Sequence, residues 1–264
     1  GRVSGVGRAL WGELLKARRS RMPLLTALAF ALAPLAGGFF MIILKDPDLA
    51  RRSGLISDKA QLTAGTADWP TYLNLLAQAT AIGGFLLFSI ILTWVFGREW
   101  ADGTLKDLLA LPTPRSAIVL AKFILVALWP AALTLLIYVI GLGVGLAVRL
   151  PAASDGAILQ GSLTLAVTAV LTLLVAVPIA FFASAGRGYL APMGVAILAV
   201  IAAQLVAAAG WGEVFPWVIP ALYARMAGPT MPPPGSPSYL IVAVTAVVGV
   251  AATLAWWGLA DQTK

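Results

Sequence analysis

The chain lacks most of the side chains that perform acid–base, nucleophilic or metal chemistry. Its 264 residues include no His and no Cys, which excludes disulfides, thiolate nucleophiles and the usual zinc sites. The same absence removes the only side chain whose ordinary pKa lies near neutrality. No pair of carboxylates lies within its long apolar stretches. The sequence therefore predicts no catalytic residue and no metal site.

The segment 98–115 carries the most organised group of polar residues in the chain. Thr104 is placed to cap a helix, and Asp107, three residues later, stands where a capping box has its acid. Pro112 and Pro114 then end the helix. We expect a helix of about eight residues, which is too short to be stable alone in water and therefore needs a surface to dock on.

This short helix is expected to have an apolar side and a polar side. Its leucines are spaced at i, i+3 and i+4 and would supply the apolar contact with a docking partner. Glu99, Asp102 and Lys106 would supply the polar contacts that set its register. The candidate docking residues are Glu99, Trp100, Asp102, Gly103, Thr104, Leu105, Lys106, Leu108 and Leu109.

The composition is that of a membrane protein, with 60% hydrophobic and 11% charged residues, whereas a soluble domain is about 25% charged. A hydrocarbon core about 30 Å thick needs about 20 apolar residues in a helix. Uncharged stretches of that length predict an all-α polytopic protein that forms a single domain over 1–264. The expected spans are about 23–44, 72–96, 117–148 (uncharged from Phe123), 158–184, 190–209 and 239–259.

The formal net charge of +7 is unevenly distributed. Lys and Arg are concentrated in alternate connections, above all in the run from Lys16 to Arg21 before the first span, so the positive-inside rule places both termini in the cytoplasm. Residues from about 4 to 21 form an amphipathic pattern that is expected to lie flat in the inner interface on anionic lipid. A topology signal with no further role is the alternative. Its apolar half comprises Val6, Leu10, Trp11, Leu14 and Leu15, and its polar half Arg8, Glu13, Lys16 and Arg19.

The connection 210–237, before the last span, is rich in aromatic residues and proline. Aromatic side chains at this density suit the headgroup boundary, and the apolar residues between the prolines favour a short element that dips back into the outer leaflet. An aromatic anchor without that element is the alternative interpretation.

Several of these strings together resemble one protein family. Glu99, Gly103, Thr104, Leu105, Leu109, Pro112, Arg115 and Lys122 match the E-x-x-x-G-T-L…P-x-x-R…K signature of ABC type-2 transporter permeases, close to the branch that exports bacitracin and lantibiotics. The strings ELLKARRSR and WGEVFPWVIPALYA are also similar to that branch, so the resemblance covers essentially the entire chain.

The resemblance implies a set of roles and partners. Residues 6–19 would be the connecting helix, and Trp100–Leu111 would contain the coupling helix. Two permease subunits, identical or paralogous, would sit on two ATPase subunits that hold the ATP and Mg. Re-entrant helices before the last span would close an extracellular gate. Because span two and the partner copy's span five are the family's cavity wall, Asn74, Gln78 and Gln204 are candidates for the substrate pathway, although packing between helices is the alternative role.

The chain itself has no G-x-x-x-x-G-K-[ST] phosphate loop, so the energy for transport would come from a separate subunit. We predict a non-enzymatic permease subunit of an ATP-driven exporter in a prokaryotic plasma membrane, in contact with lipids and not with nucleic acid. An uncharged interior suits an amphipathic or hydrophobic substrate such as a peptide antibiotic, a lipid or a drug, and export of such a drug would confer antibiotic resistance.

Three other classes of protein are less favoured. An ion-gradient-driven transporter usually keeps ionisable residues within its spans, and an intramembrane enzyme needs a nucleophile with a base or a metal cluster. The uncharged spans supply neither. A membrane immunity protein that only sequesters a toxic peptide stays open, because a docking helix indicates docking and not transport.

Overall fold

The computed structural model describes residues 2–46, 66–110, 112–151, 154–228 and 232–259, and this part of the chain consists of helices and turns with no strand. The first half comprises α1 (Arg2–Arg19), α2 (Met22–Lys45), α5 (Trp69–Ala79), the π-helix η1 (Thr80–Gly84), α6 (Phe85–Ala101), α7 (Leu105–Leu109) and α8 (Arg115–Ala147). The second half comprises α9 (Asp155–Ala176), α10 (Ile179–Ala185), α11 (Leu190–Ala208), the 3₁₀ helix η2 (Gly212–Val214), α12 (Ile219–Tyr223) and α13 (Ser236–Leu259).

Six helical segments of the described chain are long and apolar enough to cross a membrane, which confirms the all-α, six-span fold class. Five of these six helices begin before the uncharged stretches that predicted them, because polar and charged residues at the membrane boundary can continue a helix outside the hydrocarbon, and Leu190–Ala208 begins where predicted. That the chain is one domain stays a prediction. The six segments are Met22–Lys45, Trp69–Ala101, Arg115–Ala147, Gly156–Ala185, Leu190–Ala208 and Ser236–Leu259.

Two of these spans are irregular in the middle. The second contains the π turn η1 between α5 and α6, and such a turn often occurs at a functional site because it widens the helix locally. The fourth is interrupted between α9 and α10 at Pro178, which has no amide hydrogen to continue the helix. Gly249 of α13 lies directly against this break, since a Cβ there would be 2.8 Å from the Pro178 nitrogen.

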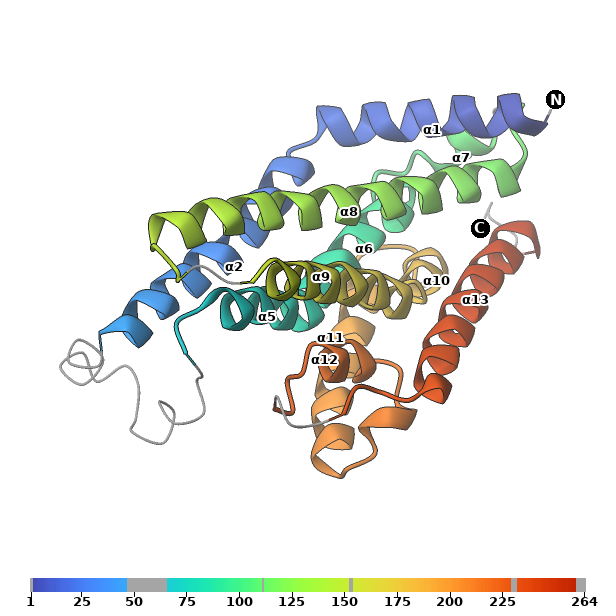
Figure 1. Ribbon diagram of the computed structural model, residues 1–264. Helices are drawn as coiled ribbons and strands as arrows, with labels where there is room; N and C mark the ends of the chain where they lie inside the picture. The colour runs from blue at the N-terminus through green and yellow to red at the C-terminus, as the bar shows by residue number, and fades with distance from the viewer. Residues whose placement is uncertain (1, 47–65, 111, 152–153, 229–231, 260–264) are drawn as a thin grey trace.

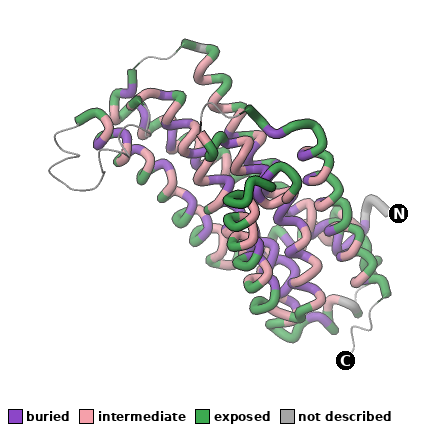
Figure 2. The backbone as a smooth tube through the Cα atoms, turned by 90° about the horizontal axis from the view of Figure 1, so that it is seen from below, coloured by how far each residue is buried: buried purple, intermediate pink, exposed green. Residues whose placement is uncertain are grey.

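The buried side chains form one core that runs through α5, α6, α8 and α9, as Figure 2 shows by the purple segments inside the bundle. α11 is the most peripheral span, with Leu198 and Leu205 65% and 68% exposed. Apolar exposure of this kind is expected where a helix faces lipid.

The two ends of the bundle are joined differently. Helix α7, the start of α1 and the end of α13 lie at one end (Figure 1), where Arg115 donates to the carbonyl of Trp257. At the opposite end Lys45 of α2 donates to the carbonyls of Val148 and Arg149 at the end of α8, at 2.7 and 2.5 Å. With six spans, both described ends of the chain lie on the side of α7.

Helix α1 lies beside the first half of α8 (Figure 1), and its contact face differs from the predicted one. The buried positions are Gly5, Glu13 and Ala17, whereas Trp11 and Leu14 are 64% and 37% exposed. Glu13, on the polar half of the helix, is therefore buried toward α8, where it pairs with Lys122, and Trp11 on the apolar half is not. That α1 lies in the membrane interface stays a prediction.

Candidate functional site

The connection between the second and third spans is a tight, ordered turn. Helix α6 ends at Ala101, and Gly103 follows with φ of 68°, a left-handed conformation that glycine adopts without strain. The Nε of Arg98 donates to Asp102 at 3.0 Å, across one helical turn and partly exposed to solvent. The turn therefore has a fixed shape and presents charge on its outside.

Helix α7 is shorter than predicted and is not capped as expected. It spans five residues, and the Thr104 side chain makes no capping bond, because its φ of −90° and ψ of 4° do not give the extended backbone of an N-cap. Only the Thr104 carbonyl takes part, accepting from the amide of Leu108 at 3.1 Å. The predicted capping box with Asp107 is therefore wrong.

The two leucines of α7 whose side chains are described face the chain itself. Leu105 is 4% exposed and belongs to the main core, and Leu108 and Trp100 pack against that core while remaining half-buried. The side chain of Leu109 lies outside the described residues. Leu105 therefore anchors α7 to the bundle, which corrects its expected place on the docking surface. The exposed positions among the described residues of this connection are Asp102, Gly103, Thr104, Lys106, Asp107, Ala110, Pro112 and Pro114.

Glu99 is the candidate whose position differs most from the expectation. Its side chain is 3% exposed, and one carboxylate oxygen accepts from the Nζ of both Lys16 and Lys122 at 2.8 Å. The other carboxylate oxygen is buried with no partner. Glu99 is thus directed into the protein, away from the surface that a partner would contact.

Glu99 belongs to a cluster of four charges, which we call the inner charge cluster: Glu13 and Lys16 of α1, Glu99 of α6 and Lys122 of α8. The Lys122 side chain is completely buried and donates to the Val95 carbonyl at 2.6 Å and to Glu13 at 3.2 Å. Lys16 donates to Glu13 at 2.7 Å. Two cations balance two anions, so the cluster is neutral as a whole.

The chemistry of the inner charge cluster is that of a structural ion network. Burial lowers the pKa of Lys16, but Glu99 and Glu13 outweigh that effect and raise its pKa above the ordinary value. Lys16 therefore stays charged at neutral pH. The cluster offers no neutral base beside a nucleophile, and the described residues contain no group of three potential metal ligands.

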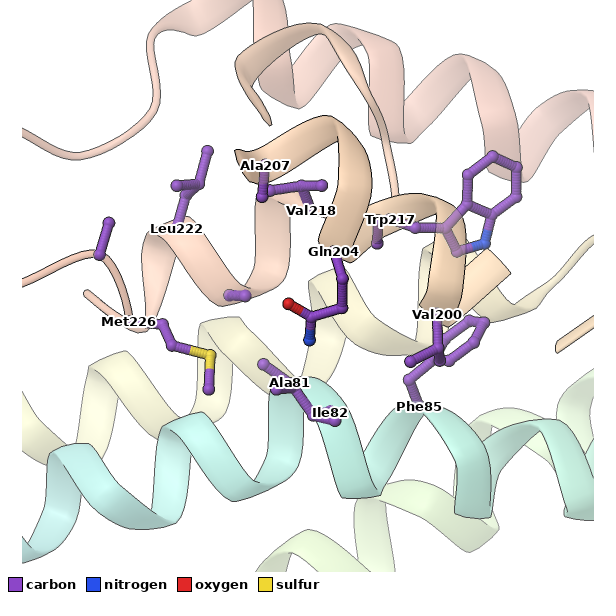
Figure 3. A pocket seen from close by; sticks show the side chains of 13 residues that line it. Ala81, Ile82, Phe85, Val200, Gln204, Ala207, Trp217, Val218, Leu222 and Met226 are labelled. Carbon is purple, nitrogen blue, oxygen red and sulfur yellow. The ribbon is translucent and has the colours of Figure 1, made fainter. Parts of the chain in front are cut away.

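At the other end of the bundle, a cavity of about 230 Å³ lies between the second span, α11 and the segment around α12. Figure 3 shows the amide of Gln204 directed into it, toward Ala81 and Ile82. Trp217, Val218, Leu222 and Met226 form the side that belongs to the segment around α12. Gln204 is thus the single amide side chain in the lining of a mainly apolar cavity, where the indole N–H of Trp217 is the other side-chain polar group.

The other two pathway candidates are placed differently. Gln78 lies in the turn before η1, and its amide donates to the carbonyl of Ala224 at 3.3 Å, which ties the second span to the segment after α12. Asn74 is half-buried in α5 and does not line the cavity. The short helices η2 and α12 stand where re-entrant elements were expected, and Ile219 and Ala224 are completely buried.

Three members of the inner charge cluster were not candidates from the sequence: Glu13, Lys16 and Lys122. Lys122 is flanked on both sides by apolar residues, from Ile118 to Leu125. A lysine in such a run must be paired when its helix is packed, because burying an isolated charge is very costly. That local pattern was the available signal for Lys122, but it does not identify the partner helix.

Comparison with known proteins places the chain among transporters. The family model described as ABC-2 family transporter protein matches residues 9–203, a range that includes the inner charge cluster and the whole connection from α6 to α8. The chain is also similar to the bacitracin transport permease protein BCRB of Bacillus licheniformis. The two are 28% identical over 179 residues, which cover 67% of this chain and 85% of the relative.

Proposed function

The chain belongs to the ABC-2 family of transporter proteins, and from this premise we propose that it is the membrane subunit of an exporter driven by a separate ATPase. It is a multi-pass membrane protein of the permease type. In the proposed complex, two permease subunits sit on two ATPase subunits, which hold the ATP and Mg. Both termini and α7 then face the cytoplasm of a prokaryotic cell.

The observation that carries this proposal is the build of the connection between α6 and α8. Leu105 anchors α7 in the core, while the side chains of Lys106 and Asp107 are left exposed beside the fixed turn at Gly103. A loop with no partner has no need of such an anchored, outward-facing polar surface. We propose that this surface, with Asp102 and Thr104, docks into a cleft of the ATPase.

Movement follows from the connectivity. Helix α7 is joined to the second span by a three-residue turn and lies a few residues before the third span. Closure of two ATPase subunits on nucleotide would displace the docked α7, and the two spans would follow as levers. Nucleotide energy would thus reach the membrane without any nucleotide contact in this chain.

The proposed substrate is an amphipathic peptide antibiotic. The relative from Bacillus licheniformis is named as a bacitracin transport permease, and the cavity around Gln204 combines an apolar lining with one amide. Such a site can hold an apolar side chain and hydrogen-bond a peptide group, but it offers no partner for a charge. Lipids and small hydrophobic drugs are the other substrates to test.

The proposal is tested by exchanging the two exposed charges of α7. Lys106→Glu combined with Asp107→Lys keeps the net charge and the leucine anchor but reverses the polar surface. We expect the purified complex to lose bound ATPase and substrate-stimulated ATP hydrolysis. Glu213→Lys, an exposed charge in η2, is the control and should leave both unchanged.

Three results would each have a distinct meaning. If the exchanged variant still binds the ATPase fully and keeps substrate-stimulated ATP hydrolysis, the exposed polar side of α7 is not the docking surface. Substrate-stimulated hydrolysis without ATP-dependent uptake into inverted vesicles would favour a sequestering protein over an exporter. Uptake driven by an ion gradient in the absence of ATP would contradict the proposed function altogether.

A further inference from the structure

The inner charge cluster connects three helices that come from separate parts of the chain. Lys122 of α8 contacts Glu13 of α1 and Glu99 of α6, and Lys16 of α1 contacts Glu99. Both helices that flank α7 are therefore bonded to α1 by charge, within the same buried site. The proposed docking function does not itself require any of these bonds.

A buried ion network contributes little to stability compared with a well-packed apolar core, because each charge must lose its water. What it can provide is a defined geometry, since few arrangements of the helices satisfy all the groups at once. Lys122 illustrates this constraint, because its single ammonium group donates to three oxygens on two other helices. Sliding α1 along α8 would break at least one of these bonds.

The position of the cluster places it between α7 and the first span. Glu99 lies in the last turn of α6 and Lys122 lies near the start of α8, so that α7 is held between their helices. On the other side, α1 is separated from α2 only by Ser20 and Arg21. A displacement of α7 therefore has a short bonded route to the first span, through the cluster and along α1.

We propose that Glu13, Lys16, Glu99 and Lys122 form a rigid joint that makes α1 move together with the inner ends of α6 and α8, so that force on α7 reaches the first span. This role rests on the proposed function for the source of the force. The four side chains are positioning residues that act through the helices. They do not contact the substrate or the ATPase.

The joint can be cut on the side of α1 alone. Glu13→Gln combined with Lys16→Met removes one negative and one positive charge and leaves the 2.8 Å pair between Glu99 and Lys122 intact. Coupling between distant sites is typically worth about 5- to 150-fold, so we expect ATP-dependent transport by the complex to fall about tenfold. Arg18→Met, on the exposed side of α1, is the control and should leave transport unchanged.

A covalent bond can replace the joint. A Cβ added to Gly5 of α1 would lie 3.9 Å from the Cβ of Ala117 of α8, within the range of about 3.5–4.5 Å that a disulfide requires. The chain has no other cysteine. Gly5→Cys with Ala117→Cys can therefore link α1 to α8 without competing thiols.

The disulfide tests whether the inner charge cluster acts as a joint or only contributes to folding. In the otherwise unchanged complex, the oxidised pair should keep full transport, because α1 and α8 already move together. In the Glu13→Gln, Lys16→Met background, oxidation should restore transport to nearly the unmodified rate, and reduction should abolish the gain. Loss of transport on oxidising the first variant, or no restoration in the second, would overturn the proposal.

A measurement without the ATPase distinguishes failure of the joint from failure of the proposed function. In the chain alone in lipid nanodiscs, cutting the joint should slow formation of the disulfide between positions 5 and 117 several-fold, because α1 no longer stays against α8. An unchanged rate would contradict the joint whatever the chain transports. If cutting the joint slows cross-linking in a chain that neither binds an ATPase nor transports, the proposed joint is supported and the proposed exporter function is contradicted.

Discussion

The two ends of the bundle contain different kinds of polar group in different surroundings. At the end that carries α7, which we call the inner end because the proposed complex places it in the cytoplasm, Lys122 is completely buried among oxygens from two carboxylates and a carbonyl. At the outer end the candidate residues are neutral amides, and that of Gln204 faces an apolar cavity. The inner end thus holds its helices together with buried ion pairs, whereas the outer end uses the exposed Lys45 and the amide of Gln78 and leaves a cavity between its helices.

This difference indicates that the two ends have different roles. Ion pairs with several hydrogen bonds fix one arrangement of helices, and they are tolerable near the membrane boundary because charge is less costly there than at the centre. An apolar cavity with one amide tolerates shifts of its walls and accepts varied ligands. In the proposed exporter, the inner end would thus transmit movement and the outer end would adapt to a substrate.

The largest effect is expected from Lys122→Met, which removes the central cation of the inner end. Glu13 and Glu99 would then share Lys16 as their only cation in the cluster. Removing one partner of a buried ion pair costs about 3–5 kcal/mol, so the variant should show a markedly lower Tm in detergent. Lys106→Met, at an exposed position, is the matched control. Equal Tm values for the two variants would contradict the conclusion that Lys122 is a buried cation on which Glu13 and Glu99 depend.

Leu105→Ala should give the next largest effect, because Leu105 attaches α7 to the core. Truncation of a buried leucine to alanine costs about 2–5 kcal/mol, and here the loss should appear as release of α7. We expect faster proteolysis within the segment 102–110 and weaker ATPase binding. Leu120→Ala, at a position 48% exposed, should change neither, and an undisturbed α7 in the Leu105 variant would mean that its anchor lies elsewhere.

The outer end should respond more mildly and in a different quantity. Gln204→Leu removes the one amide side chain in the lining of the cavity and leaves its walls in place. A net hydrogen bond is worth about 0.5–1.5 kcal/mol, so apparent substrate affinity should change by about tenfold or less while the Tm stays constant. A large fall in Tm would show that Gln204 holds the helices together and would contradict the proposed difference between the two ends.

The smallest effect concerns pH at the inner end. The pKa of Lys16 is raised in the folded protein because Glu99 and Glu13 outweigh its burial. Its contribution to stability is therefore fully present below the ordinary lysine pKa of about 10.4 and is lost as pH rises through the higher folded pKa. The Tm difference between the unmodified chain and Lys16→Met should be constant from pH 7 to about 10 and should shrink above that.

The exposed Arg18 provides the comparison for this titration. Arg18 forms none of the ion pairs of the inner charge cluster, so the Tm difference for Arg18→Met should show no such change with pH. A difference for Lys16→Met that disappeared already near neutral pH would contradict the direction assigned to the Lys16 pKa.

The spans were predictable from the sequence because a charge inside the hydrocarbon is costly enough to exclude Lys, Arg, Asp and Glu from six long stretches. The connection 98–115 could be identified for a different reason, because Pro112 and Pro114 end any helix there. Its internal details were less predictable. Whether Thr104 caps α7 depends on a backbone conformation that the neighbouring turn at Gly103 imposes.

The inner charge cluster could not be derived from local patterns. Glu13 and Lys122 are 109 positions apart, and their pairing depends on α1 packing against α8. On a helical wheel, Glu13 lies with Arg8 and Lys16 and therefore indicates a solvated face. Glu13 is nevertheless buried, because α1 packs on α8, with Gly5 lying against Ala117.

The central claim is that α7 faces the cytoplasm and docks on a separate ATPase. A single cysteine in place of Lys106, in a chain that has no other, can carry a short photo-activated cross-linker. We expect this position to be labelled only from the cytoplasmic side and to cross-link to the ATPase, more strongly when ATP is bound. Labelling from the outside only, or protection from reagents on both sides with no cross-link, would contradict it.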